Sequence, residues 1–169
     1  MYVVCAWSPT IRVYDTNTYS PRYRSINVHG MRNPHDMVIC RVDHQLYVAD
    51  WDRIWRVSAD QLEFMKWLPN GESAQHSFNA YSLSVTSRRL LVTSWRHRKL
   101  ELYSAERQLL HAIEFPTNMH RLYHAVETHR NTFVLGYIDA SKRGAVSDAF
   151  SAHLTMLSVC LSVVYLSHS

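Results

Sequence analysis

The chain has 169 residues, of which 47% are hydrophobic and 19% are charged, with 4 glycines and 5 prolines. This composition supports one domain with a hydrophobic core and excludes a disordered chain, and four glycines are too few to build a phosphate-cradling loop. The formal net charge of +4 permits an acidic partner but does not require one.

The ten tyrosines and five tryptophans favour strands over helices. Cys5 and Cys40 lie in apolar strand-like runs and Cys160 lies near the end of the chain, without the spacing of a zinc site. We therefore expect buried, reduced thiols and a cytoplasmic location. The start of the chain shows no charged segment followed by an apolar stretch, so no secretory signal is expected.

The first predicted unit, residues 1–30, is partial. Residues 2–7 form a strand-like run that ends at Trp7, and two more short runs follow at residues 11–15 and 23–28. Turn-forming residues bound each run, which is typical of short antiparallel strands.

The second predicted unit, residues 31–69, contains four strands, at 36–41, 46–51, 54–58 and 62–68. Residues 52–53 are expected to form a tight two-residue hairpin. Asp50, at the end of the second strand, is expected to cap that turn. Pro69 ends the unit because proline cannot donate to a strand ladder.

The third predicted unit, residues 70–116, repeats the same order of strands and turns, with strands at 80–86, 90–95, 99–103 and 109–115. The fourth unit, residues 117–150, begins in the same way with strands at 123–128 and 132–137 and then weakens into a polar loop and a poor strand.

Residues 151–169 contain no Asp, Glu, Lys or Arg, and residues 154–166 are apolar with interspersed serines. This tail has three interpretations: a closing strand for the fourth unit, sequence foreign to the fold, or a membrane anchor. The third is disfavoured because about 13 apolar residues fall short of the ~20 that span a bilayer, so no membrane contact is expected.

Apolar runs that each end in an aromatic residue recur at intervals of 44, 44 and 42 residues, with end residues Trp7, Trp51, Trp95 and Tyr137. Four strands per unit at this period predict the blades of an all-β propeller. The end aromatics are expected to pack between blades. About three and a half blades are present, so we expect part of a six-bladed propeller whose other blades come from sequence outside this chain; a four-bladed ring closed by the tail is the alternative.

The second unit carries a more specific pattern. Residues 33–38 (NPHDMV), followed by 45–51 (QLYVADW) and 54–57 (IWRV), resemble an NHL repeat. The third unit keeps the pattern with Thr93 and Ser94 in place of the Ala-Asp pair, and the first and fourth match by position only. The resemblance implies a six-bladed propeller of the NHL or TolB-like type. It does not imply one function, because such propellers serve many.

The chain offers two classes of function. Basic residues concentrate in connections that open on one rim, together with the aromatic end residues: Arg53, Arg96, His97, Arg98, Lys99, Arg121, Lys142 and Arg143. This face predicts a non-catalytic interaction module, without a cofactor, that binds an acidic protein or single-stranded RNA. Some NHL domains are similar in using such a face for RNA.

The alternative is a metal-dependent hydrolase or lyase, with His35 and His124 at the start of inner strands that line the propeller channel. The 11 histidines are scattered, and neither a metal-ligand spacing nor a nucleophile motif is present. The sequence therefore favours the interaction module and no metal site.

Overall fold

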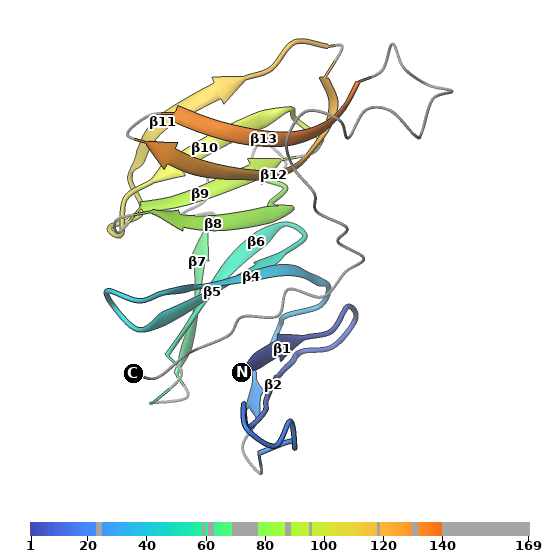
Figure 1. Ribbon diagram of the computed structural model, residues 1–169, viewed down its shortest axis with the longest axis vertical. Coiled ribbons are helices and arrows are strands. Elements are labelled where there is room, and N and C mark those ends of the chain that lie inside the picture. The colour runs from blue at the N-terminus through green and yellow to red at the C-terminus, as the bar shows by residue number, and fades with distance from the viewer. Residues whose placement is uncertain are drawn as a thin grey trace.

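The computed structural model is all-β in the residues that it describes, which are 1–22, 25–58, 60, 63–68, 78–86, 89–94, 96–117, 119–129 and 132–139. Their strands form four antiparallel sheets, which we call blades 1 to 4 in chain order (Figure 1). Among these residues there is no helix with the length and apolar character needed to cross a bilayer.

Each blade is a meander in which consecutive strands pair. The strands of blade 1 are β1 (Tyr2–Val4), β2 (Thr10–Val13) and β3 (Ile26–Asn27). Those of blade 2 are β4 (Pro34–Cys40), β5 (Gln45–Asp50), β6 (Arg53–Ser58) and β7 (Phe64–Leu68). Those of blade 3 are β8 (Ser82–Thr86), β9 (Arg89–Ser94), β10 (Lys99–Tyr103) and β11 (Leu109–Glu114). Those of blade 4 are β12 (Met119–His129) and β13 (Thr132–Asp139).

The predicted strand order is confirmed for the described residues, and the bounds of most strands agree within one or two residues. Several strands end earlier than expected, and two of these differences affect the predicted side-chain roles. β5 stops at Asp50, because Asp50 pairs with Arg53 and leaves Trp51 and Asp52 as the hairpin loop. β1 stops at Val4, so Cys5 is exposed, contrary to the expectation of a buried thiol, whereas Cys40 is buried as predicted. The predictions for residues 140–169 lie outside the described residues.

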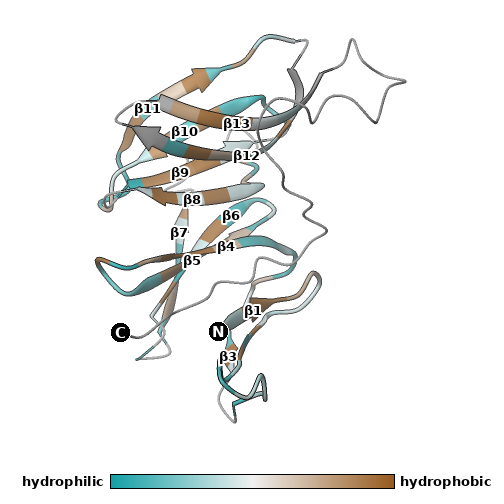
Figure 2. Ribbon diagram, in the orientation of Figure 1, coloured by the Kyte–Doolittle hydropathy of each residue, from teal (hydrophilic) through white to brown (hydrophobic). Residues whose placement is uncertain are grey.

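Side chains alternate between the two faces of each strand, and the hydrophobic core therefore forms between neighbouring blades rather than inside one blade. On β5, Leu46 and Val48 pack against Ile11 and Val28 of blade 1. Tyr47 and Ala49 point the other way and join a cluster with blade 3. Apolar residues therefore lie on both faces of β5, and Figure 2 shows apolar stretches, in brown, along the strands of blades 2 and 3. A blade that is apolar on both faces needs a neighbour on each side.

A third cluster joins blades 3 and 4, where Leu91, Leu100 and Leu102 pack with Ala125. Figure 1 shows the blades stacked in chain order. The first strands of blades 2 to 4, which are β4, β8 and β12, lie next to one another. These three inner strands carry the polar groups described below.

Candidate functional site

Two ends of the blades present different loops. One end holds the β1–β2, β5–β6 and β9–β10 connections and the segments that lead into β4 and β8. We call it the tryptophan rim, and we call the end with the β4–β5, β8–β9 and β10–β11 connections the opposite rim. The β1–β2 and β5–β6 hairpins turn on the same side of the molecule, on the right of Figure 1.

Trp51 is the central residue of the tryptophan rim. It occupies the first loop position of the β5–β6 hairpin with a φ of 42°, in the left-handed region. Trp7 has the corresponding place between β1 and β2, with a φ of 65°. A bulky side chain at positive φ is a genuine outlier that costs of order 1–2 kcal/mol. These two loops therefore hold tryptophan where glycine would be less strained.

The strand-end aromatics that the structure describes are not buried in the core between blades, contrary to the prediction. Trp7 is 81% exposed, Trp51 38% and Tyr137 43%, and Trp95 lies outside the described residues. The reason for the first two is that they stand in turns beyond the last strand pair. The aromatic core between blades 2 and 3 is instead Trp67, which is fully buried between Tyr47 and Tyr103, with ring centroids 5.0 and 6.2 Å away. The alternation of β5 could have indicated Tyr47; nothing in the repeat pointed to Trp67.

Trp51 joins blade 2 to blade 3 at the rim. The guanidinium of Arg96, in the β9–β10 connection, lies 4.9 Å from the centre of the Trp51 ring. The amide of Asn79 donates to the carbonyl oxygen of Trp51 at 3.4 Å. A cation over a tryptophan face is worth about 0.5–1 kcal/mol at an exposed site. The exposed indole is thus held in place and paired with an exposed arginine.

The other predicted basic residues divide into two kinds. Arg53 makes two 2.7 Å hydrogen bonds to Asp52, and Lys99 lies 2.8 Å from Glu114. The hydrogen bond to Asp52 raises the pKa of Arg53, and that to Glu114 raises the pKa of Lys99. Both charges are therefore balanced locally.

Arg96 and His97 are exposed and Arg98 is half-buried. The Nε of Arg98 is buried and has no hydrogen-bond partner within the described part of the chain. Arg121 lies in β12, but its side chain is not among the described ones, and Lys142 and Arg143 lie outside the described residues. Among the described residues, the basic face is therefore smaller than predicted, and Arg96 is the exposed arginine on it.

Asp50 has a different role from the predicted turn cap. Its buried carboxylate accepts hydrogen bonds from the backbone N–H of Arg32 at 3.1 Å and of Asn33 at 2.6 Å. It also accepts one from the indole N–H of Trp55 at 2.9 Å. Asp50 thereby ties the segment before β4 to β5 and β6. Asp50 therefore supports the tryptophan rim through buried hydrogen bonds and does not cap the β5–β6 hairpin.

The two histidines of the metal hypothesis occupy separate settings. The ring of His35 lies between those of Trp51 and Tyr81, with centroids 5.6 Å away on each side. Burial lowers the pKa of His35, which keeps the ring neutral. The Nδ1 of His124 contacts the hydroxyl of Ser82. Within the described residues, no three His, Cys, Asp or Glu side chains gather as a metal site would require.

A polar row joins the three inner strands, and sequence reasoning did not predict it. The hydroxyl of Ser82 donates to Asp36 at 2.8 Å, and the N–H of Leu83 donates to the same carboxylate at 2.8 Å. The same hydroxyl contacts the Nδ1 of His124. The row thus links blades 2, 3 and 4 through one serine.

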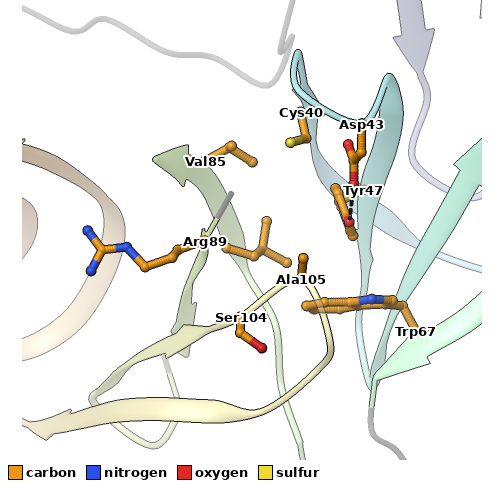
Figure 3. A pocket seen from close by; sticks show the side chains of 9 residues that line it. Cys40, Asp43, Tyr47, Trp67, Val85, Arg89, Ser104 and Ala105 are labelled. Carbon is orange, nitrogen blue, oxygen red and sulfur yellow. Dashed lines mark hydrogen bonds between the residues drawn. The ribbon is translucent and has the colours of Figure 1, made fainter. Parts of the chain in front are cut away.

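A small cavity lies between blades 2 and 3 at the opposite rim. Figure 3 shows Cys40, Tyr47, Trp67 and Arg89 around it, with the hydroxyl of Tyr47 donating to Asp43 at 3.1 Å. Its volume is ≈ 10 Å³, which is room for about one water molecule. The cavity is therefore too small to be a ligand site.

Comparison with solved structures decides the fold. The chain is similar to a chain in the crystal structure of a nidogen/laminin complex, with a TM-score of 0.57 and 14% sequence identity. The match covers 72% of this chain and 45% of that one, so this chain spans less than half the length of its structural neighbour. The neighbour is a β-propeller.

The fold is a β-propeller. No family model and no curated protein matches the sequence, so the NHL resemblance is not confirmed at the level of a family. The propeller prediction is confirmed, and the number of blades in a full ring remains a prediction.

Proposed function

We propose that this propeller is an interaction module without catalytic activity and that it binds a protein partner through the tryptophan rim. The observation that carries the proposal is the placement of Trp7 and Trp51. Both are exposed, and both sit at strained backbone positions. Strain of this kind persists where the surrounding structure enforces it. His44 and Arg107 on the opposite rim also have positive φ, so the two exposed indoles are what distinguish the tryptophan rim.

The chemistry of the rim supports a protein partner. Tryptophan and arginine are the residues most enriched in the energetic centres of protein interfaces, and here Arg96 lies directly over Trp51. Loops on a rigid scaffold are the usual place for recognition. The structural neighbour was crystallised in a nidogen/laminin complex, which agrees with such a role.

A protein is favoured over RNA because two of the predicted phosphate contacts are already engaged. Arg53 and Lys99 are paired with Asp52 and Glu114. Phosphate binding depends on cations that can release counterions from the nucleic acid backbone. The rim therefore has fewer unpaired cations for phosphate groups than predicted, and it exposes two indole rings, which favours a protein over RNA as the partner.

The test is a quantitative pull-down from cell extract with the full chain and three variants. Trp51→Ala and Arg96→Glu change the rim, whereas Arg41→Glu makes the same charge reversal at an exposed position of the opposite rim. We expect a set of proteins that the original chain and Arg41→Glu retain and both rim variants lose. With the purified partner, each rim variant should bind about 10- to 100-fold more weakly.

Undiminished capture of every partner by both rim variants would refute the proposal. The single changes are preferable to reversing Arg96, Arg98 and Lys99 together. That triple variant would also break the pair between Lys99 and Glu114, which holds β10 to β11, and loss of binding could then come from unfolding.

A further inference from the structure

A row of aromatic rings crosses from blade 2 to blade 4 beside the tryptophan rim. It begins at Trp51, under Arg96, and continues through His35 and Tyr81 to Tyr123. Successive ring centroids are 5.6, 5.6 and 6.0 Å apart. Trp51 and Tyr123 are 38% and 37% exposed, and the two rings between them are partly exposed. The row therefore consists of four neighbouring rings, each at least partly accessible, that belong to three blades.

The polar row next to it fixes these rings. His35, Tyr81 and Tyr123 each come immediately before a member of that row in the chain: Asp36, Ser82 and His124. The hydrogen bond from Ser82 to Asp36 and the contact of Ser82 with His124 join the inner strands at these positions. The strands that carry the rings are thus joined at the positions next to the rings, and an ordered surface lowers the entropic cost of binding.

The spacing of the rings suits an extended peptide. In an extended β-strand, alternate side chains share one face and two residues advance the chain by about 6.4–6.8 Å, near the 5.6–6.0 Å between successive rings. The rings are tilted to one another by 33° to 66°. Tilted neighbours leave notches for aliphatic or proline side chains, and they do not offer the parallel faces on which successive bases would stack.

The charges near the aromatic row indicate the chemistry of the peptide that would bind there. Arg96 lies at the Trp51 end of the row, and Arg32 is exposed in the segment before His35. Of the nearby acids, Asp50 is buried and Asp36 accepts hydrogen bonds from Ser82 and Leu83. The charges of Asp52 and Arg53 balance each other, which leaves the exposed Arg96 and Arg32 to complement a carboxylate.

We propose that this row binds an extended acidic peptide of the partner protein. Its apolar or proline side chains lie at alternate positions over the rings of His35, Tyr81 and Tyr123, and its carboxylate meets Arg96 at the Trp51 end. The proposal rests on the function proposed above and names the ligand of the same surface, extending it from the rim across the inner strands.

The test selects ligands for the full chain from a display library of short linear random peptides and measures the enriched peptide by fluorescence anisotropy. We expect enriched peptides with Asp or Glu beside alternating apolar or proline residues. Tyr123→Ala should weaken binding of such a peptide about tenfold, whereas Tyr123→Phe, which keeps the ring, should bind as the original chain does. Arg96→Glu should also weaken it, and Arg41→Glu should not.

Circular dichroism of each variant separates loss of the ring from loss of fold. Enrichment of peptides without acidic residues, or equal binding by Tyr123→Ala and the original chain, would overturn this inference. Stronger binding of an oligo-uridine probe than of the selected peptide would also overturn it. If Trp51→Ala loses the protein partner while Tyr123→Ala keeps it, the rim function stands and the peptide row fails; if both keep it, both proposals fail.

Discussion

Replacing Asp50 with asparagine removes one buried charge from beneath the tryptophan rim while keeping the shape of the side chain. The carboxylate is 1% exposed. One oxygen accepts from the N–H of Asn33, and the other accepts from the indole of Trp55. An amide has only one acceptor oxygen, so in Asp50→Asn the amide NH₂ faces one of these N–H donors.

The expected cost follows from these contacts. A buried donor left without a partner costs about 1–3 kcal/mol. The hydrogen bond that remains changes from charge-assisted to neutral, which loses about 1 kcal/mol more. We therefore expect Asp50→Asn to lower the free energy of unfolding by about 2–4 kcal/mol. Asp50→Ala should cost more, because it removes every acceptor.

Urea unfolding followed by tryptophan fluorescence measures this change. Asp52→Asn is the matched control, since Asp52 is two residues away, is exposed and makes a surface ion pair with Arg53. Such pairs contribute about 0–1 kcal/mol. If Asp50→Asn is within about 1 kcal/mol of the original chain, or no worse than Asp52→Asn, the role given to the Asp50 carboxylate is refuted.

Three further predictions use stability, pH and thiol reactivity. Trp67→Ala should lower the free energy of unfolding, measured in urea, by about 3–5 kcal/mol, whereas Trp51→Ala should change it by no more than about 1 kcal/mol, because only the ring of Trp67 is fully buried. Equal losses of unfolding free energy in the two variants would contradict the burial argument. Burial lowers the pKa of His35 in the folded state, so the contribution of His35 to stability is complete above about pH 6.5 and is lost as the pH falls through the folded pKa. The urea midpoint of the original chain should therefore fall between about pH 6.5 and pH 5, and His35→Gln should reduce that fall. An unchanged fall in His35→Gln would contradict this prediction. A thiol reagent should label Cys5 before Cys40, because Cys5 is exposed and burial raises the pKa of the Cys40 thiol; mass spectrometry of the labelled peptides reads the order, and faster labelling of Cys40 would count against it.

The repeat was predictable because its causes are local. Alternating apolar residues, turn formers at regular intervals and a period near 44 residues predict four-stranded blades without any knowledge of distant contacts. The same local pattern placed the strands of blades 2 and 3 correctly. The prediction for the end of β5 was wrong by one residue, because Asp50 and not Trp51 is the last residue of β5 to pair with β6, opposite Arg53.

The side-chain roles were less predictable. Whether Lys99 is an open cation or a paired one depends on Glu114, which the β10–β11 register brings opposite it. Trp51 and Trp67 are the same residue type at strand ends in one blade, yet one is exposed and the other buried. Their neighbours decide this: the face of β7 meets blade 3, and the loop of the β5–β6 hairpin meets solvent.

The sequence by itself determined that this chain is a series of antiparallel units, four-stranded in blades 2 and 3, because strand periodicity and turn chemistry act over a few residues. Only the tertiary structure decided what those units present. Asp36 and Ser82 are 46 residues apart and share a hydrogen bond, and the rings of His35, Tyr81 and Tyr123 are neighbours because β4, β8 and β12 lie next to one another. Contacts between blades depend on how the units stack, so the aromatic row and the tryptophan rim exist only once the blades are packed together.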